Sequence, residues 1–534
     1  MKLLKEFVLS IGVVTAFFAI SHEASAKNLV YCSEASPEGF DPALYANGTA
    51  FDASAWTVYN RLVEFDPDKP GVFPGLAESW QISDDGKEYT FRLRKNVKFQ
   101  KTAFFTPTRT LNADDVIFTF DRARNPDNPW HTYTSGIRYQ YFESMGLNTL
   151  IKGIVKVDDQ TVKFILERPD APFLADLAMA FLSINSLEYA QQLEKQGKRE
   201  QFNLQPVGTG PFSFVAYQKD ALIRYKANSD YYAGKPKIDN LVFSITTDPA
   251  VRAQKLKAGE CDIMSYPAPA DIGELKSNPD LKVVEQPGLN IAYMAYNTTM
   301  PPFDNVDVRR ALNMSVNKKA IVDAVFDGAA IVAKNPMPPT IWGYNDNVKD
   351  DAYDPEKAKQ MLEAAGVKNF KMKIWAMPIS RPYMPNARRA AELIQSDFKK
   401  VGVDAEIVSM EWGEYVKAGK ARDRDGAIIL GWTGDNGDPD NFLGVLLSCI
   451  SRGTTNYAGW CSKPFDDLIE KGKTVTDQQE RTRLYEQAQL IFKDQAPWLT
   501  LDHSTVFMPM RKNVTGFKLY PVSGYRFEHV DIEN

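Results

Sequence analysis

Between residues 354 and 431 the chain alternates regularly between helix patterns and short apolar strand patterns. A helix is predicted at 354–366, since proline at the first helical position and glycine just past the end are common boundary signals. Strand patterns follow at 371–377, 403–407 and 427–431, separated by two further helix patterns. Strands joined by helices at this spacing pair in parallel. This region is therefore predicted to form a parallel α/β sheet.

The rest of the chain follows a different pattern. Segments 89–94 and 161–166 alternate as strands do, and a helix is predicted at 112–123, with Asn112 as its cap. A stretch at 287–302 that is rich in proline and glycine at its ends separates this half from the regular one. At roughly 150 residues per domain, 534 residues predict three or four domains.

The first 26 residues have the features of a secretory signal peptide. Lys2 and Lys5 supply the positive charge, residues 7–20 are apolar, and 24–26 form a small-residue cleavage site. The apolar run is too short to span a membrane comfortably, although an uncleaved anchor is the competing interpretation. No later apolar run reaches about 18 residues, so the mature chain is predicted to be exported and soluble.

Four cysteines follow the predicted cleavage site, which in an exported protein indicates two disulfides. Three pairings are possible. Cys449–Cys461 is favoured because the two are close in sequence, and Cys32–Cys261 then follows by elimination. Zinc binding is disfavoured, because no C-x-x-C pair occurs and no histidine lies near a cysteine. A lipid anchor is disfavoured too, since Cys32 lies six positions past the cleavage site.

Charge and motifs exclude several functions. The formal net charge of -5 offers no basic surplus for nucleic acid, so no nucleic-acid partner is expected. The segment 208–213 lacks the third glycine of a dinucleotide site, and 435–440 has the glycine of a calcium loop misplaced and is interrupted by Pro439. Hydrolase and zinc-protease motifs are absent, and sequence neighbours such as His503 and Ser504 are rarely a catalytic base and its nucleophile. We therefore expect no metal, no cofactor and no enzyme activity.

Two loops leave the carboxyl ends of predicted parallel strands, where open sheets bind their ligands. The loop 376–383 carries Arg381, and the loop 432–440 carries several aspartates. Arginine binds a carboxylate through two parallel hydrogen bonds, and a buried aspartate can take up an ammonium. If both strands lie in one sheet, the two charges face one crevice and suit a zwitterion such as a dipeptide, which spans roughly 7 Å when extended. The alternative is a surface arginine and an aspartate-rich turn with no ligand.

Several motifs along the mature chain occur in a fixed order, at 29–34, 36–40, 75–80, 111–116, 207–212 and 309–312. Through them the chain resembles the extracellular solute-binding family 5 of bacterial ABC importers, which includes peptide and nickel binding proteins. Its segments around Arg381 and Asp435 are most similar to the dipeptide-binding branch.

The resemblance implies an α/β, two-lobed periplasmic-binding-protein-like fold of the cluster C type, with an extra α+β domain. Two crossings between the lobes are expected at 287–288 and at 503–504. The implied bounds are 27–58, 209–286 and 505–534 for lobe I, 59–208 for the extra domain and 287–504 for lobe II.

The resemblance also implies roles for site residues. Asp435 would hold the ammonium of a peptide and Arg381 its carboxylate. Tyr383, Trp432 and Gly48 would line the same pocket, and Gly434 would allow close approach of the backbone. The chain departs from the family at Ala46, where a pocket hydroxyl is expected, so one ligand hydrogen bond would be missing.

The implied function is a monomeric periplasmic receptor that captures dipeptides and delivers them to the membrane permease of an ABC importer. The same architecture could instead bind haem, 5-aminolevulinate, a nickel complex or longer peptides. Two other classes remain open at this point, namely a periplasmic peptide hydrolase and a chaperone-like protein that binds unfolded chains.

Overall fold

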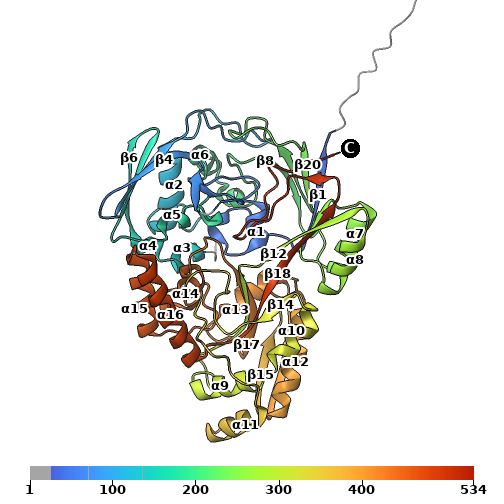
Figure 1. The fold of residues 1–534 in the computed structure, drawn as a ribbon. Coiled ribbons are helices and arrows are strands. Elements are labelled where there is room, and N and C mark those ends of the chain that lie inside the picture. Colours follow the sequence, from blue (N-terminus) through green and yellow to red (C-terminus); the bar gives the residue numbers. More distant parts are fainter. Residues whose placement is uncertain (1–25, 70, 135, 137, 534) are drawn as a thin grey trace, which may run out of the picture.

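One long strand connects the two halves of the molecule. The computed structural model describes residues 26–69, 71–134, 136 and 138–533, so the predicted signal peptide lies outside the described residues except for Ala26. Strand β18 (Trp498–Arg511) belongs to a twelve-stranded sheet of order β16-β15-β17-β13-β18-β11-β1-β10-β9-β8, and β12 and β14 also pair with β18. Figure 1 shows β18 running from the lower half of the molecule to the upper half.

The lower half contains the predicted parallel segment. Strand β15 pairs in parallel with β16 and β17, which confirms the prediction for this part of the chain. The sheet as a whole is mixed, because β13 runs antiparallel to both β17 and β18, and β14 runs antiparallel to β18. The strands are β13 (Asn290–Tyr296), β14 (Ala330–Val332), β15 (Phe370–Trp375), β16 (Val403–Val408) and β17 (Ala427–Thr433).

Helices cover this half, and most of the α-helices begin at a residue whose side chain accepts a hydrogen bond from the first turn. The side chain of Asp354 accepts a hydrogen bond from the backbone of Lys357 at 2.9 Å, Pro355 is the first helical residue, and Gly366 has a φ of 77° just past the end. The helices are α9 (Val306–Met314), α10 (Lys318–Phe326), α11 (Pro355–Ala364), α12 (Ala387–Lys400), α13 (Trp412–Gly419), α14 (Asp440–Leu447), η5 (Cys449–Ser451), α15 (Lys463–Thr474) and α16 (Gln478–Gln495). In the core, Trp498 stacks on Tyr293 with ring centroids 3.7 Å apart.

The upper half is built on β1, which lies between β10 and β11 and is parallel to both. Its apolar core is aromatic, with Tyr31 packed against Phe243 and Phe527. The elements are β1 (Asn28–Ser33), η1 (Pro42–Leu44), α1 (Gly48–Ala53), β8 (Phe212–Gln218), β9 (Leu222–Ala227), β10 (Asn240–Ile245), α7 (Pro249–Ala258), β11 (Ile263–Met264), η4 (Pro269–Asp271), α8 (Ile272–Ser277), β12 (Leu281–Pro287), β19 (Val514–Thr515) and β20 (Asp531–Ile532).

A separate antiparallel sheet, of order β4-β5-β7-β6, lies at the upper left in Figure 1. It contains both alternating segments that the sequence predicted as strands, and the helix expected at 112–123 is α2 (Ala113–Arg124), capped by Asn112. The other elements are β2 (Val63–Phe65), β3 (Val72–Pro74), β4 (Ala77–Ile82), β5 (Glu88–Leu93), α3 (Gln140–Ser144), α4 (Leu147–Leu150), β6 (Ile151–Asp158), β7 (Thr161–Leu166), α5 (Phe173–Asp176), η2 (Ala180–Leu182), α6 (Leu187–Lys195) and η3 (Arg199–Asn203).

The chain passes between the two halves at two adjacent places. Strand β12 continues into β13 through Gly288, and β18 pairs with β13 at Asp502 and with β12 from Thr505 onward. Asn290 ties the two passages together, since its amide donates to the carbonyl of Ser504 and its side-chain oxygen accepts from the backbone nitrogen of Ser504 at 2.9 Å. A Cβ on Gly288 would lie 2.4 Å from the same Ser504 carbonyl, so glycine is required there. The bounds of the lobes stay a prediction.

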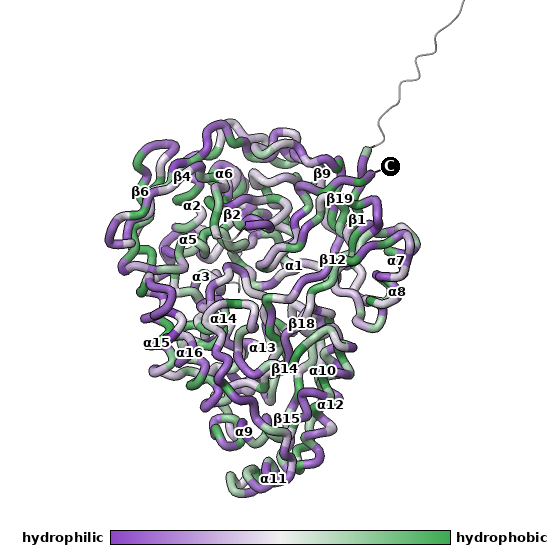
Figure 2. The backbone as a smooth tube through the Cα atoms, viewed as in Figure 1, coloured by the Kyte–Doolittle hydropathy of each residue, from purple (hydrophilic) through white to green (hydrophobic). Residues whose placement is uncertain are grey.

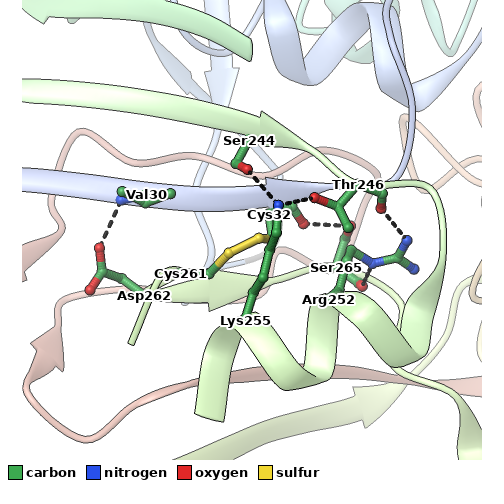
Figure 3. The surroundings of a disulfide bond; sticks show 9 residues. All are labelled: Val30, Cys32, Ser244, Thr246, Arg252, Lys255, Cys261, Asp262 and Ser265. Carbon is green, nitrogen blue, oxygen red and sulfur yellow. Dashed lines mark hydrogen bonds between the residues drawn. A yellow bond between two sulfur atoms is a disulfide. The ribbon is translucent and has the colours of Figure 1, made fainter. Parts of the chain in front are cut away.

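Both expected disulfides are present. Cys32 in β1 is bonded to Cys261, with their Cα atoms 5.8 Å apart, and Cys449 is bonded to Cys461 across 12 residues. Figure 3 shows the first bond beside α7, whose Lys255 donates to Thr246 at 2.9 Å. The first disulfide therefore joins β1 to the segment between α7 and β11.

Hydrophobic and hydrophilic residues alternate along the tube throughout the molecule (Figure 2). Among the described residues, no helix combines the length and the apolar character that a membrane crossing requires.

Candidate functional site

A cavity of about 630 Å³ lies between the two halves of the molecule, beside helix α3. Its walls come from segments that are far apart in sequence. They include residues within 38–52, Gly136, Arg138 and Gln140, residues 381–383, residues within 412–420, residues 430–433 with Asp435, residues within 453–457, and 519–525 near the C-terminus. The volume is that of a small-molecule site.

Strand pairing explains how the two loops singled out from the sequence reach this cavity. Strands β15 and β17 are parallel neighbours, with Trp375 opposite Ile428, so the loops that follow them leave the same edge of the sheet. Arg381 and Asp435 both line the cavity. The structure thus brings together the two charges that the sequence placed at one crevice, and their roles toward a ligand stay a prediction.

The Arg381 side chain is almost fully buried and bonded to the other half of the molecule. Its Nη1 donates to Oε1 of Glu34 at 2.6 Å, and its Nη2 donates to Oγ1 of Thr49 at 2.8 Å. The guanidinium lies 5.0 Å from the ring centroid of Trp412. Burial alone would lower the pKa of Arg381, but the Glu34 carboxylate and the hydroxyl of Tyr266 raise it above its ordinary value. The cation is permanent.

Asp435 is buried and held by two hydroxyl groups. The Tyr141 hydroxyl donates to its Oδ2, and the Ser523 hydroxyl donates to its Oδ1. Burial raises the pKa of Asp435 to about 6, although both hydrogen bonds act to lower it. No cation pairs with Asp435 among the ion pairs of the described residues. A buried carboxylate of this kind gains from an ammonium supplied by a ligand.

Asn441 fixes the geometry around that carboxylate. Its Oδ1 accepts from the backbone nitrogen of Asp435 at 2.9 Å and from Nε1 of Trp432 at 3.0 Å. Its Nδ2 donates to the Tyr141 hydroxyl at 2.8 Å. One amide at the start of α14 therefore orients the carboxylate, its phenol donor and the neighbouring indole.

Three of the other predicted residues line the same cavity. Tyr383 packs against Gly431, where a Cβ would lie 2.2 Å from the tyrosine ring, and Trp432 lies edge-on to Tyr141 with centroids 5.5 Å apart. Gly48 begins α1, and a Cβ there would lie 4.0 Å from Nη1 of Arg381. Ala46, which stands where a hydroxyl was expected, also lines the cavity.

Gly434 has a different place. It is not in the cavity wall, and a Cβ on it would lie 2.7 Å from the side chain of Leu289 and 2.8 Å from that of Phe442. Its carbonyl accepts from the backbone nitrogen of Ser523 at 2.9 Å. The geometry gives this glycine a packing role beside Asp435 and the C-terminal segment.

Sequence reasoning missed the partners of the two charged residues. Glu34 lies in a motif that carried the family resemblance, and Thr49 directly follows Gly48, but no sequence pattern pairs either residue with Arg381. Tyr141 and Ser523 carry no motif and lie 294 and 88 residues from Asp435. Only the tertiary fold brings them together.

The metal-binding and hydrolase motifs considered in the sequence can also be located in the structure. No cluster of metal-binding side chains occurs in the part of the chain that the structure describes. In the segment that resembled a calcium loop, Asp438 pairs instead with Arg481 at 2.8 Å. His503 is buried with its Nδ1 2.7 Å from the carbonyl of Asn290, and the Ser504 hydroxyl donates to the carbonyl of Pro382. These neighbours are thus bonded to backbone at the passage between the halves, and not to each other.

Fold and cavity together define a class of protein. Two lobes that share strands of one sheet and enclose a ligand-sized cavity are typical of periplasmic-binding-protein-like receptors, which close around their ligands by a hinge. Comparison with known proteins gives the family within this class.

The chain belongs to the bacterial extracellular solute-binding proteins, family 5, whose middle-region model matches residues 71–453. It is 53% identical to a dipeptide-binding protein of Escherichia coli, over 100% of this chain and 99% of that protein. It is 48% identical to heme-binding protein A of Haemophilus influenzae, over 96% of this chain and 93% of that protein. Among solved structures, it is similar to a dipeptide-binding protein of Pseudoalteromonas sp. SM9913 in complex with Met-Leu, with a TM-score of 0.92, 39% identity and coverage of 95% and 100% of the two chains.

Proposed function

We propose that this protein is a periplasmic receptor that captures dipeptides and delivers them to the inner-membrane permease of an ABC importer. The observation that carries the proposal is the burial of one fixed cation, Arg381, and one carboxylate, Asp435, in the walls of a single cavity. The proposal is supported by two of the similar proteins, from Escherichia coli and Pseudoalteromonas, which are named as dipeptide-binding proteins. The protein would be exported by its predicted signal peptide and act as a monomer without a cofactor.

A zwitterion satisfies both ends of this site. The ligand ammonium would meet the Asp435 carboxylate, which has hydroxyl donors but no cation beside it. The ligand carboxylate would meet Arg381. A guanidinium has five N–H donors, and Glu34 and Thr49 each accept only one bond, from Nη1 and from Nη2. Donors therefore remain for the ligand. Gly48 leaves the approach to Nη1 unobstructed by a side chain.

Closure of the cleft would couple binding to transport. Arg381 follows a strand of the lower half, whereas Glu34 follows β1 of the upper half, so their bond exists only when the halves are together. Asp435 is likewise bonded to Ser523 near the C-terminus. A ligand whose contacts come from both halves shifts the equilibrium toward the closed form, which a permease can distinguish from the open one.

The predicted bounds of the lobes and of the extra domain fit this scheme. The passages at 287–288 and 503–504 would be the hinge, and the extra domain would contribute Tyr141 to the wall of the site. The two disulfides lie outside the moving passages, so closure would not strain them.

Haem is the second candidate ligand, because heme-binding protein A is among the similar proteins. The charges favour the dipeptide. Haem brings two carboxylates and no ammonium, so it leaves Asp435 buried without a counter-ion.

Calorimetry on the mature, ligand-free chain tests the proposal. Ala-Ala is expected to bind, whereas N-acetyl-Ala-Ala and Ala-Ala amide should each bind far more weakly, because each lacks one charge of the zwitterion. Equal affinity for all three would reject the charge clamp, and tight haem binding without dipeptide binding would favour the second candidate. Release of free alanine during the incubation would instead indicate a hydrolase.

A further inference from the structure

The cavity contains a cationic group that the dipeptide clamp does not use. Lys420, directly after α13, lines the cavity, and its Nζ donates to Oε1 of Gln140. An ammonium has three donors, so this bond leaves two. No acidic partner lies within ion-pair distance of Lys420 among the residues that the structure describes, although 36 such pairs are present there.

Gln140 fixes this lysine from the opposite wall. Its Nε2 donates to the carbonyl of Leu44 at 3.0 Å, so its Oε1 is turned toward Lys420. Gln140 begins α3, the helix that also carries Tyr141. The lysine is therefore held by the same helix that supplies the phenol on Asp435.

Lys420 follows the far end of α13 from Arg381, the residue that we assign to the ligand carboxylate. Helix α13 begins with Trp412, whose ring lies 5.0 Å from the guanidinium of Arg381, and Lys420 follows the last residue of the helix. Eight residues at 1.5 Å per residue separate the two positions by about 12 Å along the helix axis. The two cations therefore lie beside opposite ends of α13, which favours separate ligand groups for them.

Glu38 is the negatively charged residue that acts on Lys420, and it does not form an ion pair with the lysine. Burial lowers the pKa of Lys420 to about 8, and Glu38 opposes this shift. Glu38 is bonded through Oε1 to the amide of Asn47 at 3.0 Å, its Oε2 has no partner, and burial raises its pKa. The other charged residues in the cavity wall, which include Arg138, Glu414 and Lys417, form no ion pair with Lys420.

We propose that Lys420, positioned by Gln140, is a subsite for a second carboxylate of the ligand. The carboxylate would come from an acidic side chain of a dipeptide or from the C-terminus of a tripeptide whose ammonium is on Asp435. The inference rests on the proposed function and specifies which peptides the receptor prefers.

Isosteric ligand pairs test this subsite on the full mature chain. Ala-Glu and Glu-Ala are compared with Ala-Gln and Gln-Ala, and Ala-Ala-Ala is compared with its C-terminal amide, by calorimetry near pH 7. The acidic member of at least one pair should bind about tenfold more tightly, the order expected of one charge-assisted hydrogen bond. Preference in the dipeptide pairs identifies an acidic side chain as the carboxylate, and preference in the tripeptide pair identifies a chain terminus.

Lys420→Met should abolish that preference, so that the acidic and the amide member of each pair bind with equal affinity, since only the second carboxylate loses its partner. Lys399→Met, at an exposed lysine in the last turn of α12, is the matched control and should change nothing. Equal affinity within every pair, or a preference that survives Lys420→Met, overturns the subsite while the clamp stands. Failure of Ala-Ala and Ala-Gln to bind at all overturns both proposals.

Discussion

Arg381 and Glu34, 347 residues apart, form a buried ion pair at 2.6 Å that joins the two halves of the molecule. Glu34 is only 1% exposed, and it also accepts from the hydroxyls of Thr49 at 2.9 Å and Ser265 at 3.1 Å. The arginine that we assign to the ligand carboxylate is thus held in place by a carboxylate of the opposite lobe. In the proposed function, ligand binding and closure of the cleft would share the Arg381 side chain.

Arg381→Ala should weaken Ala-Ala binding by about 100-fold, since the ligand carboxylate would lose charge-assisted hydrogen bonds in a desolvated site. Calorimetry at pH 7 measures this loss. Ala-Ala amide is the matched ligand, because its affinity should depend much less on Arg381. Ordinary Ala-Ala affinity in the variant would contradict the assignment.

Glu34→Ala should lower the free energy of unfolding by about 3–5 kcal/mol, because it leaves the buried guanidinium of Arg381 without its counter-ion. Urea denaturation of the ligand-free protein measures the change. Glu78→Ala is the matched control: Glu78 pairs with Arg92 at 2.9 Å, but both side chains are exposed, so its removal should cost less than about 1 kcal/mol. Equal, small losses in both variants would show that the buried pair contributes no more than the exposed one.

Local signals made much of the fold predictable. The cap at Asn112, the proline and glycine that bound α11, and the alternation at 89–94 act through neighbouring residues, and each prediction is confirmed. The shared cavity of Arg381 and Asp435 was also predictable, because parallel strands end at one edge of a sheet.

Long-range partners were not predictable. Strand β13 is buried at every position, so its sequence carries no sign of which neighbour it pairs with or in which direction, and the antiparallel part of the sheet was missed. Tyr141 and Ser523 bond to Asp435 from a short helix and from the C-terminal segment, and neither has a local signal. The packing role of Gly434 was hidden for the same reason, since Leu289 and Phe442 crowd it only in the folded chain.

Removal of the second disulfide, by Cys449→Ser with Cys461→Ser, should lower the free energy of unfolding by about 3 kcal/mol, because the short closed loop no longer restricts the unfolded chain. Urea denaturation measures the loss. The loop between the cysteines lines the cavity through Gly453, Thr454, Thr455 and Tyr457. Ala-Ala affinity at pH 7 should still stay within about twofold, because hydrogen bonds from the Thr455 hydroxyl to Ser144 and to the Val445 carbonyl hold the loop without the disulfide. Ordinary stability, or a strong loss of binding, would contradict this assignment of the bond to stability alone.

The affinity for Ala-Ala should fall as the pH is lowered through about 6. Burial raises the pKa of Asp435 to about 6, so below this pH the free protein carries a neutral carboxyl that must lose its proton before it can pair with an ammonium. Well below the pKa the loss approaches about tenfold per pH unit, whereas the affinity should level off near pH 7 and fall again near pH 8, where the α-amino group of the ligand loses its proton. Calorimetry from pH 5 to pH 8 measures the profile. Asp435→Asn should bind weakly with no such slope, and a wild-type affinity that is constant from pH 5 to pH 7 would remove the carboxylate from the binding step.

Tyr141→Phe tests whether the phenol acts on the ligand through Asp435. The Tyr141 hydroxyl donates to Oδ2 of Asp435 and lowers its pKa, so without this bond the pKa should rise further above its ordinary value. The midpoint of the affinity profile should therefore move to higher pH, and at pH 7 the affinity should fall several-fold, about 1 kcal/mol for one lost hydrogen bond. A merely structural role would lower the affinity equally at every pH, and so would leave the midpoint where it is in the wild type.

Tyr353→Phe, at an exposed tyrosine outside the cavity wall, is the matched control. A midpoint that moves in the Tyr141 variant and not in the control would establish the phenol as one of the two hydroxyls, with Ser523, that keep Asp435 ionised for its ligand. An unmoved midpoint would assign Tyr141 to packing alone.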